Sequence, residues 1–124
     1  MTRDWEAAAR EGDAQALAEQ LAAGADIDAL DRYGETALML ACLAGSLSAV
    51  RFLIRANANL DKTAKYNLSA SMLAVINGHE AIVRALAGAD LTLQSSGAPG
   101  FHNKTVADLA RARGLKSLAS DLAN

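Results

Sequence analysis

At 124 residues the chain has room for one domain, because domains usually contain roughly 100–150 residues. A formal net charge of −2 at pH 7 is too small and of the wrong sign for a protein held to nucleic acid by phosphate contacts. The single cysteine has no disulfide partner within the chain, and together with two histidines it offers few metal ligands. A disulfide-stapled scaffold and a zinc module are therefore excluded, and we expect no nucleic-acid partner.

The start of the chain is polar and charged, and no apolar segment follows it, so no signal peptide is predicted. The longest apolar run covers residues 37–44, which is far shorter than the roughly 20 residues that a membrane-spanning helix needs. We therefore expect a soluble, cytoplasmic protein that has no membrane partner.

The sequence repeats itself at an offset of 33 residues, which carries Tyr33 onto Tyr66 and Gly45 onto Gly78. The same offset carries Gly12 onto Gly45, and a fourth copy follows an insertion, with Gly114 standing 69 residues beyond Gly45. Such a period is the signature of a repeat architecture. It predicts one domain over residues 1–124 with four repeats, at approximately 1–30, 31–63, 64–94 and 95–124.

Each copy has the same sequence pattern, which predicts two short helices. Thr36 is placed as an N-cap before a run of helix formers, and Gly45 is placed as a left-handed stop. An apolar stripe with helical spacing follows the glycine and predicts the second helix. Helices this short are not stable alone, so each pair must bury a face on the next pair. The expected helices are 4–11, 14–22, 36–44, 47–55, 69–77, 80–87, 105–113 and 115–122.

Asp31, Gly34 and Thr36 open the repeat, a helix of small residues follows, and a Gly-Ala-Asp segment closes it. With the 33-residue period, this pattern resembles the ankyrin repeat. The resemblance covers nearly the whole chain and implies an all-α solenoid of stacked helix-turn-helix units with projecting β-turn tips. The family's Thr-Pro-Leu-His segment reads Thr-Ala-Leu-Met at 36–39, and its proline and histidine are absent from every copy. The histidine's hydrogen bonds between neighbouring turns are expected to be missing.

The turns between repeats carry their own signals. Asn67 and Asn103 align with Gly34, and Asn57 takes the place of Gly24, so we expect left-handed turn residues there rather than glycosylation. The connection over residues 95–102 is several residues longer than its equivalents and holds the only proline. It predicts an extended turn on the edge where the family's hairpin fingers project.

No arrangement of nucleophile, base and orienting acid can be assembled from the sequence. Cys42 falls on a small position of a first helix and is expected to be a buried spacer, and His79 is expected to pack or cap at the start of a second helix. The acidic run over residues 26–31 fails as a calcium loop, because its fifth position is Leu30. A phosphate-binding Gly-Lys-Ser/Thr segment is absent. We expect no enzyme, no cofactor and no metal.

The resemblance implies a concave groove, formed by the turn tips and the exposed side of the first helices, that selects a protein partner. The residues of this chain that fall on those positions are Arg32, Tyr33, Glu35, Leu43, Lys65, Tyr66, Leu68, Ile76, Asn77, Phe101, His102 and Lys104. We expect Tyr33, Tyr66, Phe101 and Lys65 to be the anchors, since interface hot spots favour aromatic residues. Leu43, Leu68 and Ile76 are expected to point outward and add an apolar patch.

Because the turn projects away from the helical stack, we expect that a tyrosine at its tip is not part of the core. The alternative is that Tyr33 and Tyr66 merely pack on neighbouring turns and that the groove is unoccupied.

Charge is unevenly distributed along the chain. Residues 1–35 hold nine acids and three bases, giving −6, and the remainder holds five acids and nine bases, giving +4. Such a gradient can orient a partner of complementary polarity or favour head-to-tail contacts.

The sequence thus predicts a monomeric, non-catalytic module that binds a protein partner of unknown identity. The alternative is a dedicated inhibitor or immunity-type neutraliser of one specific enzyme or toxin. A self-associating array is a third possibility, and an enzyme that uses Cys42 or the histidines is the least supported.

Overall fold

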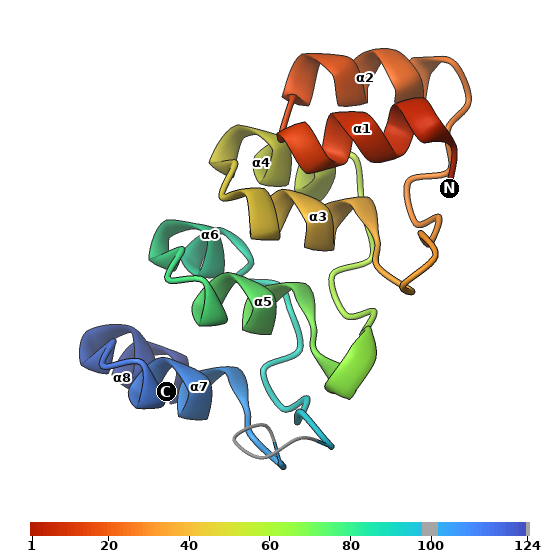
Figure 1. Cartoon of the computed structure of the whole chain (residues 1–124). Coiled ribbons are helices and arrows are strands. Elements are labelled where there is room, and N and C mark those ends of the chain that lie inside the picture. Colours follow the sequence, from red (N-terminus) through yellow and green to blue (C-terminus); the bar gives the residue numbers. More distant parts are fainter. Residues whose placement is uncertain (98–101, 124) are drawn as a thin grey trace.

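The computed structural model describes residues 1–97 and 102–123. Over these residues the chain is helical, with no named strand. The helices pair in chain order, and Figure 1 shows the pairs stacked in one column with the longer connections projecting on one side. The elements are α1 (Arg3–Glu11), α2 (Ala14–Ala22), α3 (Ala37–Ala44), α4 (Leu47–Arg55), the 3₁₀ helix η1 (Lys65–Asn67), α5 (Ala70–Ile76), α6 (Glu80–Ala85), α7 (Val106–Ala112) and α8 (Lys116–Ala123).

The stack has an inner and an outer row of helices. Helices α1, α3, α5 and α7 pack side by side in the inner row, and α2, α4 and α6 do so in the outer row. Every predicted helix is present, with bounds that lie within two residues of those expected. The largest difference is in the third repeat, where α6 ends at Ala85. The all-α solenoid predicted from the repeats is therefore the fold of this protein.

Side-chain hydroxyls start the inner helices, as the sequence indicates. The Oγ1 of Thr36 accepts a hydrogen bond from the Met39 amide at 3.2 Å, and Thr105 caps α7 in the same way. Gly45 ends α3 with φ 73°, in the left-handed region. The predicted left-handed turn residues are also confirmed, at Asn57, Asn67 and Asn103, with φ of 70°, 55° and 53°.

Met39 gives the first helix of the second repeat a weak cap. The sulfur of Met39 accepts from the Thr36 amide at 3.5 Å, which is a poor acceptor at a long distance. In the fourth repeat Asp108 stands at the same place and accepts from the Thr105 amide at 3.0 Å. A carboxylate near a helix N-terminus is favourable, so α7 has the better-formed start.

The core is continuous through the stack and is closed by polar residues at its ends. All six residues from Ala37 to Cys42 are buried, because α3 lies between α1 and α5. The position of Met39 is taken by Glu6 in the first repeat, and the position of Cys42 is taken by Arg111 in the last. Polar end repeats keep a solenoid from exposing its apolar interior.

In the first three repeats, the turn between the paired helices is covered by a side chain of the next repeat. Ser46 Oγ donates to the carbonyl of Gly12 at 2.7 Å, and Nη1 of Arg113 donates to the carbonyl of Ile76 at 2.7 Å. His79 packs its ring on Gly45, where an added Cβ would lie 2.8 Å from the ring. It makes no side-chain cap, so of the two roles expected for it, the structure shows packing.

Aspartates link neighbouring repeats just after the C-terminal ends of the outer helices, at the other end from the covered glycine turns. Oδ1 of Asp28 accepts from the amide of Asn59 at 2.9 Å, and Oδ1 of Asp61 accepts from the amide of Asp90 at 2.7 Å. These bonds, with the covered glycine turns, fix the first three repeats against one another at both ends of their outer helices.

The buried position of Cys42 leads to a first testable prediction. Its side chain is fully buried, and burial raises the pKa of the thiol to about 12, so almost no thiolate exists at neutral pH. We expect no reaction with Ellman's reagent in the folded protein at pH 8 and one equivalent of reaction in 6 M guanidinium. The labelling rate should follow the unfolded fraction as urea is added. Rapid labelling in the absence of denaturant would contradict the fold given for α3.

Candidate functional site

The projecting turns between successive repeats form a row of three tips along one edge of the stack (Figure 1). We define the tip strip as residues 32–35, 65–68 and 102–104. The strip lies on the side of the inner helices and holds most of the binding residues predicted from the sequence.

The first tip is organised by one buried carboxylate. Oδ1 of Asp31 accepts from the amides of Tyr33 at 2.9 Å and Glu35 at 2.8 Å, so the carboxylate spans the turn. Its Oδ2 accepts from Nη2 of Arg10 at 3.1 Å, while the Asp31 side chain is 0% exposed. The guanidinium neutralises the buried charge and ties the turn to α1. Sequence reasoning missed Arg10 as a support of the site, because no local pattern connects residues 21 positions apart.

The second tip has no such carboxylate, since Ala64 stands where Asp31 stands in the first. The turn instead forms η1, in which Tyr66 has φ 61°, a conformation that a bulky residue rarely adopts. The connection that leads to the third tip supports it: the amide of Ser96 donates to the carbonyl of Tyr66 at 2.7 Å, and the side chain of Asn67 donates to the carbonyl of Gln94 at 2.8 Å.

The third tip belongs to the long connection predicted as an extended turn. Its two arms pair through Ser95, whose amide donates to the carbonyl of Lys104 at 2.8 Å and whose carbonyl accepts from the amide of Asn103 at 2.8 Å. Gly97 lies against the ring of Tyr66, where an added Cβ would be 2.8 Å from Cδ1. The third tip is thereby docked on the second. Residues 98–101 of this connection lie outside the described residues.

A depression of about 260 Å³ separates the first tip from the second. Its apolar lining consists of two aromatic residues, Tyr33 and Tyr66, which we call its walls, and three aliphatic residues, Ala64, Leu68 and Leu73, which we call its floor. Glu35 and Lys65 complete the lining. An apolar floor between two aromatic walls is a place where an apolar side chain can be removed from water.

Each tyrosine of the depression carries a neighbouring cation over its ring. Cζ of Arg32 lies 5.2 Å from the centre of the Tyr33 ring, and Nζ of Lys65 lies 5.0 Å from the centre of the Tyr66 ring. At exposed sites such contacts contribute about 0.5–1 kcal/mol, so these cations are only loosely held. Tyr33 is 61% exposed, which makes it the most open of the large apolar side chains described as exposed.

Two predictions about individual site residues are wrong. Leu68 does not point outward: it is 8% exposed, because its backbone pairs with Ala64 and its side chain turns under the tip to form the floor of the depression. Tyr66 is half-buried and packs against the core, because the third tip covers one side of its ring. The argument that a tip tyrosine stays out of the core therefore holds for Tyr33 alone.

The other predicted residues divide by exposure. Leu43 is 38% exposed, Ile76 and Glu35 are half-buried, and Phe101 lies outside the described residues. Asn77 is exposed, but its side-chain amide donates to the carbonyl of Leu73 at 2.8 Å and so supports its own helix. The remaining exposed residues are Arg32, Lys65, His102 and Lys104. Ala64 and Leu73 line the depression and were not predicted, because helix periodicity assigns Leu73 to the core.

Glu35 has an unfavourable environment for its charge. Partial burial raises the pKa of its carboxyl, the nearby Asp31 carboxylate raises it further, and Arg10 opposes the shift. The ionised form of Glu35 therefore costs the folded protein free energy at neutral pH.

Glu35→Gln should remove this cost. We expect the free energy of unfolding at pH 7 to increase by roughly 0.5 kcal/mol, a small effect because the side chain is half exposed. The raised folded-state pKa means that the penalty is full above that pKa and absent below the ordinary value near 4.5, so the advantage of the variant should shrink at pH 4. Urea unfolding at pH 4 and pH 7 measures both. An equal difference at the two pH values would contradict this reading.

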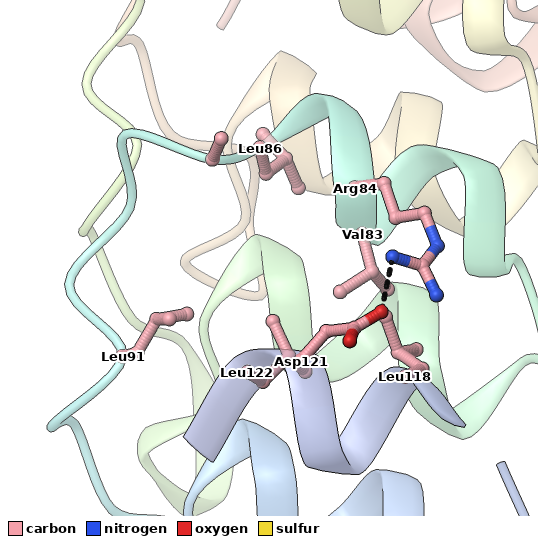
Figure 2. Close-up of a pocket in the computed structure, with 8 residues that line it drawn as sticks. Val83, Arg84, Leu86, Leu91, Leu118, Asp121 and Leu122 are labelled. Carbon is pink, nitrogen blue, oxygen red and sulfur yellow. Dashed lines mark hydrogen bonds and ion pairs between the residues drawn. The ribbon is translucent and has the colours of Figure 1, made fainter. Parts of the chain in front are cut away.

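A second depression, of about 350 Å³, opens between α6 and α8 on the outer row. Figure 2 shows Arg84 reaching from α6 to Asp121 on α8, with Leu118, Leu122 and Leu91 around them. The Arg84–Asp121 ion pair is 2.9 Å long. Arg84 also pairs with a glutamate on its own helix, so its charge is already engaged here.

Neither depression carries the features of a metal centre. Among residues 1–97 and 102–123, no group of three or more His, Cys, Asp or Glu side chains is placed to hold a metal ion. Over the same residues, no helix is long and apolar enough to cross a membrane.

The family model for ankyrin repeats, in three copies, matches residues 5–95. No curated protein matches the chain.

Proposed function

Because the chain belongs to the ankyrin repeat family, whose repeats generally mediate protein–protein interaction, we propose that it binds one protein partner through its tip strip and the concave face beside it. The observation that carries this proposal is Tyr33, which stands 61% exposed beside an apolar depression that it shares with Tyr66. A large aromatic side chain that is left open at the edge of an apolar hollow is a typical anchor of an interface.

The backbone of the second tip supports the same surface. Tyr66 is held at φ 61°, and strain of this kind costs about 1–3 kcal/mol and gathers at functional sites. The second tip is hydrogen-bonded to the connection that carries the third, and the first tip is tied to α1 through Asp31 and Arg10, so little conformational freedom is lost when a partner binds.

The proposed role is non-catalytic, monomeric and cytoplasmic, and needs no cofactor. Cys42 is buried with a raised pKa, and the His79 ring lies on Gly45. His102 is exposed on the third tip, where its Nε2 lies 3.3 Å from the side-chain amide nitrogen of Asn103. Nothing in this arrangement supplies a nucleophile with a base beside it.

The test is capture from source-organism lysate with three versions of the protein as bait. We expect a partner that the wild type retains and the Tyr33→Ala/Tyr66→Ala variant loses. The matched control is Arg51→Ala/Arg55→Ala, which removes two exposed side chains from the outer helix α4 and should retain the partner. A partner that is kept by the tyrosine variant and lost by the control would contradict the proposal.

The nature of the captured protein separates the two forms of this function. A single enzyme or toxin whose activity falls on one-to-one binding identifies the dedicated neutraliser. Partners that keep their activity identify an interaction module.

A further inference from the structure

The tip strip has a local charge opposite to that of the whole chain. Its basic residues are Arg32, Lys65 and Lys104, all exposed, and its one acid is Glu35. The nearby Asp31 adds no free charge, because its buried carboxylate is paired with Arg10 at 3.1 Å. The chain as a whole carries −2, and residues 1–35 carry −6. The positive strip is therefore a distinct feature of the surface.

The three basic side chains are available to a partner. None of them forms an ion pair with any other described residue. Arg32 and Lys65 lie over the rings of Tyr33 and Tyr66, in contacts that are weak at exposed sites. An incoming carboxylate can pair with either cation while the tyrosine stays in place.

The depression between the first two tips sets the second requirement. Its floor of Ala64, Leu68 and Leu73 offers no charged group, and its walls are the two tyrosine rings. An apolar side chain is the complement of this lining. Lys65 lines the depression, and the guanidinium of Arg32 lies 5.2 Å from the ring of Tyr33, which lines it too. Carboxylates next to a bound apolar side chain would therefore have a cation beside each tyrosine.

We infer that the tip strip takes an acidic segment of a partner protein, with one large apolar side chain in the Tyr33–Tyr66 depression and carboxylates against Arg32 and Lys65. The inference rests on the proposed function and names the chemistry of its partner. Glu35 is the one element that opposes such a segment, since its carboxylate lines the same depression. Removing that charge should raise the affinity for an acidic segment. A substitution that merely deletes a contact would lower the affinity instead.

In the experiment, random 12-residue peptides are displayed and selected for binding to the intact protein. The selected peptides are then synthesised, and their affinities are measured by fluorescence anisotropy. We expect peptides rich in Asp and Glu around one Leu, Ile, Phe or Trp. Arg32→Glu/Lys65→Glu should weaken their binding by about tenfold, as expected for the loss and reversal of two exposed ion pairs. Glu35→Gln should strengthen it about twofold to threefold.

The matched control reverses the same amount of charge elsewhere. Arg51→Glu/Arg55→Glu alters the outer helix α4 and should change the affinity less than twofold. Circular dichroism of each variant confirms that the helices are retained. Equal weakening by both double variants would mean that only net charge matters, and would overturn the inference.

The other outcomes separate the inference from the function beneath it. Basic or uncharged peptides that bind in a Tyr33- and Tyr66-dependent way would overturn the acidic segment and leave the binding surface standing. Peptides that bind equally to Tyr33→Ala/Tyr66→Ala would contradict both. A labelled 20-nucleotide polyuridine strand that binds more tightly than the peptides, with the same dependence on Arg32 and Lys65, would replace a protein partner with single-stranded nucleic acid.

Discussion

Leu53→Ala is expected to lower the free energy of unfolding by about 2–5 kcal/mol, the range for emptying a fully buried leucine site. Leu53 is 0% exposed in α4, and α4 packs against both α2 and α6. Each repeat of a solenoid is stabilised by its neighbours, so a defect in an interior repeat weakens two interfaces at once. Such a loss is a large part of the total stability of a domain of this size.

The matched control is Leu122→Ala, because Leu122 in α8 stands at the place of Leu53 in the last repeat. Leu122 is half-buried and borders the open depression beside α6, so the loss should be about 1 kcal/mol or less. Urea unfolding followed by far-UV circular dichroism gives both values. Equal losses at the two positions would contradict the placement of α4 inside the stack and α8 at its end.

The second large effect is expected at Asp31. Asp31→Ala removes the acceptor for the amides of Tyr33 and Glu35 and leaves Arg10 without its buried partner. We expect a loss of about 2–3 kcal/mol, because two turn amides lose their acceptor. The first tip should loosen, and binding at Tyr33 should weaken with it.

Asp31→Asn separates the two roles of the carboxylate. The asparagine oxygen can still accept from the amides of Tyr33 and Glu35, while the charge opposite Arg10 is lost, so about half of the loss should remain. Urea unfolding gives the stabilities, and hydrogen exchange at the amides of residues 33 and 35 reports the turn. If the asparagine variant loses as much stability as the alanine variant, the hydrogen bonds across the turn do not hold the tip.

The helices and their turns were predictable because the residues that start and end each helix lie next to it in the sequence. A hydroxyl before an apolar run and a glycine after it specify a helix without reference to any distant residue. The asparagines at left-handed positions could be found in the same way, by aligning Asn67 with Gly34. Repetition strengthened each signal, since a position that recurs in every copy must satisfy the same packing.

The tips could not be predicted as well, because their burial depends on contacts between different repeats. Tyr33 and Tyr66 are equivalent in sequence, yet only Tyr66 is covered by the inserted connection, through Ser96 and Gly97. The sequence shows that the connection over residues 95–102 is longer than its equivalents, but it does not show that this connection packs on Tyr66. The burial of Leu68 was missed for a related reason: its place in a turn predicts an exposed side chain, whereas its backbone pairs with Ala64 and its side chain lies beneath the tip.

Amide chemical shifts measured during a titration locate the binding surface on the protein. The ¹⁵N-labelled protein is titrated with the partner recovered by the wild type, or with the selected peptide, and each shift is followed to saturation. The account predicts that the largest changes fall on residues 32–35, 65–68 and 102–104, with small changes on the outer helices α2, α4 and α8. Shifts concentrated on the outer helices, or around Arg84 and Asp121 between α6 and α8, would contradict it.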